Sequence, residues 1–118
     1  MIKLTDAELK VMNVIWHDGD CSAKHISDVL LEQTGWHINT TYTIIHKCIE
    51  KGAIEREDPK FICHAAVSKE EAQADMTEDL VNKLYDGSVG SLFAALLGKD
   101  TLSDEQIAKL RQIVAEME

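Results

Sequence analysis

The most constraining feature of this chain is a series of helix start and stop signals in its first 52 residues. Thr5 begins TDAE, a capping box in which a hydroxyl and a carboxyl group satisfy the first free amides of a helix. Ser22 precedes a second apolar stripe and Asn39 a third, and both residue types are good N-caps. Each stripe is followed by a glycine, a common helix terminator: Gly19, Gly35 and Gly52. The sequence therefore predicts three short helices joined by tight turns.

A hairpin is predicted directly after the third helix. Residues 54–57 and 61–67 each suit a strand, and the DPK turn between them contains Pro59, the only proline. The few aromatic residues also favour a helical core over a sandwich or barrel. Three helices followed by a hairpin is the order of a winged helix-turn-helix. We therefore expect a mainly α protein with a small β-hairpin, in which residues 1–67 form a winged-helix domain.

Residues 68–118 are predicted to form three further helices. Ser68 opens a second capping-box pattern, SVGSLFAALLG suits a short apolar helix, and Ser103 caps the last helix. Helices of this length are too short to cover their own apolar side chains, and below about 70 residues oligomerisation is a usual remedy. We expect a three-helix homodimerisation domain; the alternative is a monomer whose helices fold back on the first domain. The predicted interface residues are Met76, Leu80, Leu84, Val89, Leu92, Phe93, Leu96, Leu97, Ile107, Leu110 and Val114.

The formal net charge of −9 limits the classes of partner. So acidic a chain is not expected to bind nucleic acid indiscriminately. The acid is unevenly distributed, because residues 1–67 hold ten acidic and seven basic side chains whereas residues 68–118 hold eleven and five. No apolar run has the length of a signal peptide or a membrane span, so we expect a cytoplasmic protein without membrane insertion.

The third helix has a polar face that a merely solvated helix does not need. Its core-facing side is formed by Thr41, Ile44, Ile45, Cys48 and Ile49. Short hydrogen-bonding side chains on the other side let a helix enter the major groove of DNA and contact phosphates or base edges. Glu50, also on that side, favours the alternative of a solvated face. The candidate DNA-binding residues are Asn39, Thr40, Tyr42, Thr43, His46 and Lys47 on this helix, with Lys24, Arg56, Lys60 and also Lys51 for the flanking backbone.

Five segments, from Leu4 almost to the end of the chain, carry a family resemblance: LTDAELKVMNVIW, Trp36 with the Thr-rich helix ending in KG, AIER, LYDGSVGSL and LSDEQIAKLRQIV. They resemble the penicillinase-repressor family of bacterial transcriptional regulators, which includes the methicillin-resistance and copper-responsive repressors. The resemblance implies a winged helix that reads a palindromic operator in double-stranded DNA and a C-terminal dimerisation domain. It also implies repression of a resistance or homeostasis operon until a signal releases the protein.

Departures from the family pattern bear on the operator and the signal. The resemblance to the β-lactam branch implies a membrane sensor metalloprotease as a partner and cleavage of the repressor, but its Asn–Phe bond falls at Ala95–Leu96 here. Related repressors begin the recognition helix with SPKT where this chain has HINT, so Asn39 replaces a lysine, and Tyr42 replaces an arginine or glutamine. These changes indicate that the operator can differ in sequence. The chain lacks the paired Cys-x-Cys motifs of the copper-responsive branch.

The spacing of the cysteine and histidine residues bears on whether the chain binds a metal ion. Cys21 and His25 lie four residues apart, Cys63 and His64 are adjacent and Cys48 is on the third helix, but compact zinc pairs such as C-x₂-C are missing. An odd number of cysteines makes free thiols the default. We expect no metal site and no cofactor, and a metal- or redox-responsive regulator stays an alternative. No phosphate loop or nucleophile motif predicts an enzyme. A winged-helix protein-interaction module without DNA binding is the remaining alternative.

Overall fold

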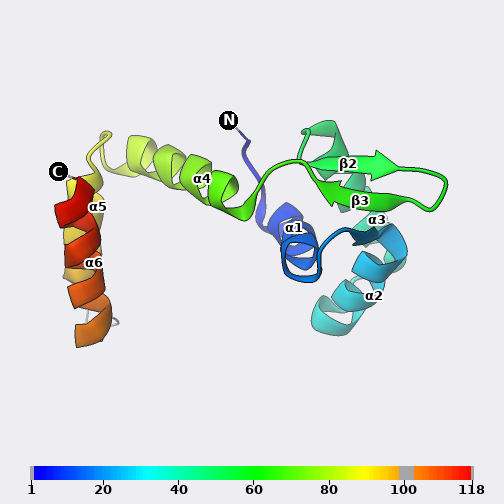
Figure 1. The fold of residues 1–118 in the computed structure, drawn as a ribbon, viewed down its shortest axis with the longest axis horizontal. Coiled ribbons are helices and arrows are strands. Elements are labelled where there is room, and N and C mark those ends of the chain that lie inside the picture. The colour runs from blue at the N-terminus through cyan, green and yellow to red at the C-terminus, as the bar shows by residue number, and fades with distance from the viewer. Residues whose placement is uncertain (1, 99–102, 118) are drawn as a thin grey trace. The chain divides into compact units, whose positions relative to one another are not determined.

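A computed structural model describes residues 2–98 and 103–117, and it contains two compact units, Met1–Met76 and Thr77–Glu118 (Figure 1). The first unit contains α1 (Asp6–Asp18), β1 (Cys21–Ser22), α2 (Ala23–Thr34), α3 (Ile38–Glu50), β2 (Ile54–Glu57) and β3 (Ile62–Ala65). The helix α4 (Lys69–Leu84) contains the boundary, and α5 (Val89–Leu97) and α6 (Asp104–Met117) complete the second unit. The predicted functional division after residue 67 stays a prediction.

The caps on α1 and α2 form as the sequence predicted. The Thr5 hydroxyl accepts a hydrogen bond from the Glu8 amide at 3.2 Å, and the Thr5 amide donates to the Glu8 carboxylate at 2.9 Å. The Ser22 hydroxyl accepts from the His25 amide at 3.0 Å. Gly35 ends α2 with φ of 77°, a left-handed conformation that glycine adopts without the strain of a side chain. These local signals place α2 directly before α3, as a helix-turn-helix requires.

The sheet has one strand more than the predicted hairpin. The antiparallel strands lie in the order β1-β3-β2, with Arg56 of β2 and Cys21 of β1 both opposite Cys63 of β3. The strand β1 is only two residues long, and two residues are too few for alternation to reveal a strand. The predicted second strand is also shorter than expected, because residue 61 belongs to the turn 58–61 and residues 66–67 form a bend. The mainly α fold with a small antiparallel sheet is otherwise confirmed.

The core of the first unit lies where α1, α2 and α3 meet the sheet. Its largest fully buried side chains include Met12, Ile26, Leu30, Ile45 and Ile54. Ala72 of α4 is part of this core, and Met76, a predicted interface residue, packs partly buried against it. The Trp16 indole donates to the Val67 carbonyl at 3.0 Å and so connects α1 to the segment after β3. The core holds α3 in place and leaves its other face free.

All three cysteines are free thiols. Burial raises the pKa of Cys48 to about 12 and that of Cys63 to about 11. Burial also raises the pKa of Cys21, which is only partly exposed. A thiol that stays protonated at neutral pH is a poor nucleophile and a poor metal ligand. The surroundings of all three therefore favour packing over metal or redox chemistry.

An ion pair between buried Glu8 and partly exposed Lys51 connects the beginning of α1 to the end of α3. The side chain of Glu8 is 2% exposed, and its Oε1 accepts a hydrogen bond from Lys51 Nζ at 2.6 Å. Lys51 Nζ also donates to the Lys3 carbonyl at 2.7 Å. Burial alone raises the pKa of the Glu8 carboxyl, but the hydrogen bonds from Lys51 and Thr5 outweigh it and the pKa is lowered. The charge on Glu8 is thus retained inside the protein by a cation on the helix that follows the turn.

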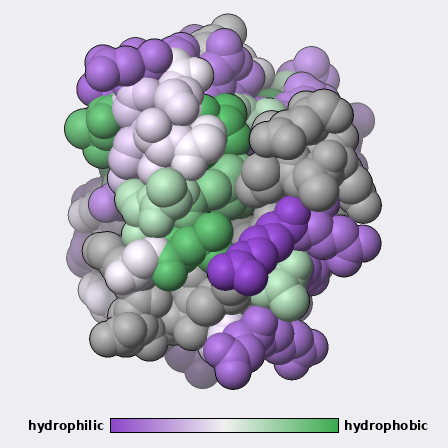
Figure 2. Space-filling view, turned by 90° about the vertical axis from the view of Figure 1, so that its left-hand side faces the viewer, coloured by the Kyte–Doolittle hydropathy of each residue, from purple (hydrophilic) through white to green (hydrophobic). Residues whose placement is uncertain are grey.

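The second unit leaves much apolar surface open. No residue of α5 is fully buried, and Leu84 and Leu96 are 68% and 37% exposed. Figure 2, which faces α5 and α6, shows green hydrophobic surface between purple hydrophilic side chains. The predicted interface side chains Ile107, Leu110 and Val114 lie outside the described residues. None of the helices that the structure describes has the length and apolar character of a membrane span.

Replacing Lys51 with methionine removes the cation and leaves the Glu8 carboxylate buried beside an apolar side chain. We expect the free energy of unfolding at neutral pH to fall by roughly 1–3 kcal/mol, a value limited by solvent around Lys51, which is 38% exposed. Folding lowers the pKa of Glu8, so the pair stabilises the fold above the ordinary value of 4.5, and this contribution is lost as the pH falls through the lowered pKa.

Urea unfolding of the wild type and of Lys51→Met, near neutral pH and near pH 3, measures both effects. The exposed Lys10→Met is the matched control. An unchanged midpoint for Lys51→Met at neutral pH contradicts this role of the pair.

Candidate nucleic-acid interface

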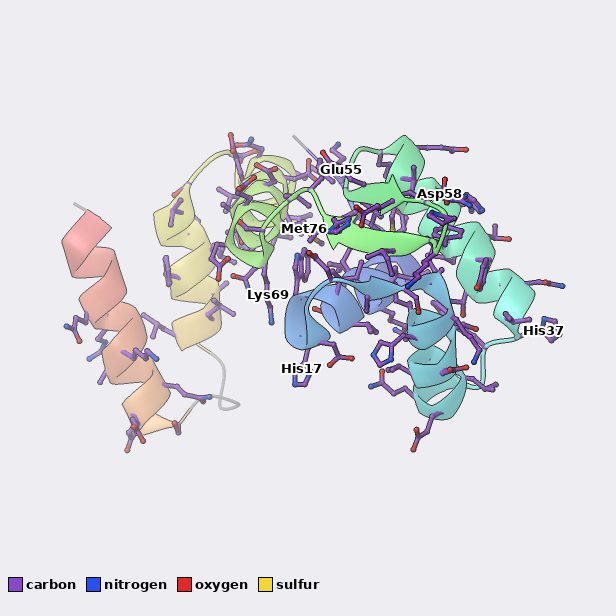
Figure 3. All side chains as sticks on the ribbon, turned by 45° about the vertical axis from the view of Figure 1, so that its right-hand side comes forward. His17, His37, Glu55, Asp58, Lys69 and Met76 are labelled. Carbon is purple, nitrogen blue, oxygen red and sulfur yellow. The ribbon has the colours of Figure 1, made fainter. Side chains whose placement is uncertain are left out.

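The N-cap residue of α3 differs from the one that the sequence predicted. Asn39 was predicted to cap this helix, and that prediction is wrong: the N-cap is His37, whose ring Nδ1 accepts a hydrogen bond from the Asn39 amide at 3.1 Å. Histidine is not among the favoured N-cap residues, so the pattern gave no signal for it. Figure 3 labels His37 at this end of α3. Because the ring performs the capping, the Asn39 side chain lies in the first turn and is exposed.

The two faces of α3 separate as predicted. Thr41, Ile45 and Cys48 are fully buried, and Ile44 and Ile49 are partly exposed. The outer face exposes Asn39, Thr40, Thr43, His46 and Lys47, with Tyr42 partly buried at its margin. Glu50 is also exposed. The structure thus brings all six candidate residues of α3 to the solvent side of a single helix.

A shallow hollow lies over the first two turns of α3, lined by Ile38, Asn39, Tyr42, Thr43 and His46. The Thr43 hydroxyl donates to the Asn39 carbonyl at 2.9 Å, so its proton is used within the helix and its oxygen can only accept from a ligand. Ile38 is 48% exposed beside these polar groups. Sequence reasoning missed Ile38; an apolar residue just before a polar helical face was the available signal. The hollow combines hydrogen-bonding groups with an apolar edge.

Arg56 is held against an aromatic ring in the hairpin. Its Cζ lies 3.6 Å from the centroid of the Phe61 ring, and its Nε donates to Asp58 at 2.9 Å. The Phe61 ring lies edge-on to Tyr42, with centroids 5.8 Å apart, and 5.7 Å from the His46 ring. Figure 3 labels Asp58 at the turn between β2 and β3. Phe61, which sequence reasoning assigned only to a strand, thus connects the hairpin to two candidate residues of α3.

The remaining candidate cations lie on other elements of the first unit. Lys24 is exposed in the first turn of α2, and Lys60 is exposed in the turn 58–61. The acidic Glu55, Glu57 and Asp58 also lie in the hairpin, so the hairpin carries little net charge. Lys51, also a candidate for contacts to the flanking DNA backbone, is not available for them, because it pairs with Glu8.

His64 of β3 bridges two carboxylates. Its Nδ1 lies 2.8 Å from Asp20 and its Nε2 lies 3.2 Å from Glu57, and these hydrogen bonds raise the pKa of the histidine. Its neighbour Cys63 is fully buried, as expected when adjacent strand residues point to opposite faces. Within the two described ranges, no three His, Cys, Asp or Glu side chains are grouped as a metal ion requires.

Comparison with known sequences identifies relatives over nearly the whole chain. The profile of the family described as penicillinase repressor matches residues 4–116. The chain is 32% identical over 114 residues to the methicillin resistance regulatory protein MecI of Staphylococcus aureus, covering 95% of this chain and 93% of MecI. It is 28% identical over 116 residues to the penicillinase repressor of Bacillus licheniformis, covering 97% and 91%.

Two solved structures share the fold. The solution structure of the DNA-binding domain of the repressor BlaI matches with a TM-score of 0.54 and 26% identity, covering 60% of this chain and 93% of that domain. The solution structure of the monomeric form of Bacillus licheniformis BlaI, in complex with the blaP half-operator, matches with a TM-score of 0.51 and 27% identity, covering 58% and 87%. A winged helix, an outward polar face on α3 and a profile that matches residues 4–116 agree: the chain belongs to the penicillinase repressor family.

Proposed function

We propose that this protein is a cytoplasmic transcriptional repressor that binds an inverted-repeat operator in double-stranded DNA as a homodimer. The observation that carries the proposal is the outer face of α3, which presents hydrogen-bonding side chains next to the hairpin cation Arg56. The relative BlaI, similar in fold, is solved in complex with its half-operator, which supports DNA as the ligand of this face. Such a protein acts by occupying DNA and needs no catalytic group.

The first turns of α3 supply the proposed contacts to bases. The Asn39 amide can pair with the two hydrogen-bonding atoms of an adenine edge, and Lys47 can bind a phosphate or a guanine edge. Thr43 can accept from a cytosine amino group, since its own proton is already donated within the helix. Thr40, Tyr42 and His46 flank these groups and contribute further polar contacts.

Three cations are the proposed contacts to the DNA backbone: Lys24, Arg56 and Lys60. Lys24 lies in the first turn of α2, where free helix amides also attract phosphate. The acidic side chains of the hairpin limit the total attraction, so affinity depends on fit as well as on charge. This balance is consistent with specific rather than indiscriminate binding.

The second unit supplies the proposed pairing of two chains. Its open apolar residues include Leu80 and Leu84 at the end of α4 and Leu96 of α5, and a second copy can cover them. Val89, Leu92, Phe93 and Leu97 are partly exposed and complete the proposed surface. Two recognition helices in successive major grooves, about 34 Å apart, read an inverted repeat. Each chain alone makes only one set of contacts, so loss of the dimer weakens binding strongly.

Release by proteolysis is part of the proposal. A membrane sensor metalloprotease is the proposed partner, and Ala95–Leu96 is the proposed bond. Both residues lie in α5 and are exposed in the single chain. Cutting α5 removes part of the apolar surface that joins two chains, which separates the two recognition helices and releases the operator.

Binding to DNA is tested on a duplex that the protein selects from a random pool. We expect log K to fall linearly with log salt concentration, by about 0.9 for each phosphate contact. Lys47→Ala should weaken binding by about 1–3 kcal/mol if it reads a base. Lys69→Ala, well separated from His37 in Figure 3, is the matched control and should bind like the wild type. If no duplex is retained at low salt, the protein-interaction alternative takes the place of the repressor.

The apolar edge of the hollow gives a second expectation. If Ile38 contacts the methyl group of a thymine, replacing that thymine with uracil should weaken wild-type binding by about 0.8 kcal/mol, roughly fourfold in Kd. Ile38→Ala should bind the thymine and uracil duplexes equally. A scan of single uracil replacements across the half-site, measured by fluorescence anisotropy, checks this. Equal losses for the wild type and Ile38→Ala at every thymine contradict the contact.

Pairing is tested by sedimentation equilibrium at micromolar concentration. We expect twice the chain mass of 13.2 kDa for the wild type. Leu96→Glu should shift the protein toward the monomer, because it places a charge in the apolar surface. Ser91→Glu adds the same charge at an exposed polar position of the same helix and should leave the dimer intact. A wild type that sediments as a single chain contradicts the homodimer.

A further inference from the structure

The backbone of Phe61 is in an unusual conformation. Its φ is 52°, in the left-handed region that bulky side chains rarely adopt. Phe61 closes the turn 58–61, where glycine or asparagine avoids this strain. Strained residues persist where the surroundings hold them, and they concentrate at sites of function. The strain therefore raises the question of what the ring of Phe61 does.

Contacts from three elements hold Phe61 in this conformation. Its carbonyl accepts a hydrogen bond from the Ala23 amide at 3.0 Å, which fixes its backbone at the start of α2. Its ring lies edge-on to Tyr42 at 82° and tilted against His46 at 56°, and both of these residues belong to α3. Phe61 thus connects the hairpin to the start of α2 through its backbone and to the outer margin of α3 through its ring.

The Phe61 ring also contacts the guanidinium group of Arg56. The guanidinium carbon lies 3.6 Å from the ring centroid, close enough for both stacking and cation–π attraction. The hydrogen bond from Nε to Asp58 fixes the guanidinium from a second direction. That bond uses Nε, and the two Nη groups are the part of the fork that can reach a further acceptor. An arginine held in this way loses less rotamer freedom when it binds a phosphate.

We propose that Phe61 is a positioning residue, which sets the hairpin against α3 and holds the Arg56 guanidinium ready for a DNA phosphate. This inference rests on the proposed function. It adds that the hairpin and the recognition helix bind DNA as one preassembled surface, with Tyr42 and His46 shared between base contacts and support of the ring.

The test compares three substitutions at Phe61 on the selected duplex. Phe61→Leu keeps an apolar side chain but removes the aromatic face; we expect affinity to fall roughly five- to tenfold and the salt slope to fall by about 0.9, one phosphate contact. Phe61→Tyr keeps the ring and should retain the affinity and the salt slope of the wild type. Phe61→Gly removes the ring but relieves the strain at φ of 52°, which offsets part of the lost packing; urea unfolding checks that it folds, and it should bind like Phe61→Leu.

A double-mutant cycle with Arg56→Ala separates positioning from packing. If Phe61 acts through Arg56, Phe61→Leu should cause no further loss of salt slope in the Arg56→Ala background. The inference is overturned if Phe61→Leu leaves the salt slope unchanged. It is also overturned if Phe61→Leu lowers the slope in the Arg56→Ala background as much as in the wild type. Either result leaves DNA binding by the wild type intact. A wild type that binds no duplex overturns the proposed function and this inference together.

Discussion

The burial of one face of α3 is the constraint on which the rest of the structure depends. Thr41, Ile45 and Cys48 are inaccessible to solvent, so the helix cannot rotate about its axis without opening the core. The pair between Lys51 and Glu8 fixes the end of α3 against α1. A helix held along one face and at one end must present its opposite face in a fixed orientation, and that face is the proposed DNA-binding surface.

Local sequence signals predicted most of the fold. Thr5, Ser22 and the glycines marked the ends of α1 and α2 because capping depends on residues close in sequence. Helical periodicity separated the two faces of α3 for the same reason. The cap by His37, the strand β1 and the contacts of Phe61 could not be predicted, since each depends on a ring orientation or on a partner distant in the chain.

The proposed site combines cations that attract DNA with acidic side chains that limit this attraction. Arg56 and Lys60 lie among Glu55, Glu57 and Asp58, and Asp58 bonds directly to Arg56. The first unit of one chain therefore offers few uncompensated cations, and in our proposal its binding to DNA relies on the shape of α3 and on the hairpin that Phe61 positions. In the proposed homodimer, pairing through the second unit, whose α5 buries no residue within one chain, supplies the second set of contacts that a weak single site needs.

The most direct test is a map of backbone amide shifts when a half-site duplex is added to the ¹⁵N-labelled protein. The account predicts the largest changes at residues 38–47 of α3 and 56–61 of the hairpin, together with smaller changes at the start of α2. Changes concentrated on α1 and the end of α2, with residues 38–47 unaffected, would contradict the assignment of α3 as the recognition helix.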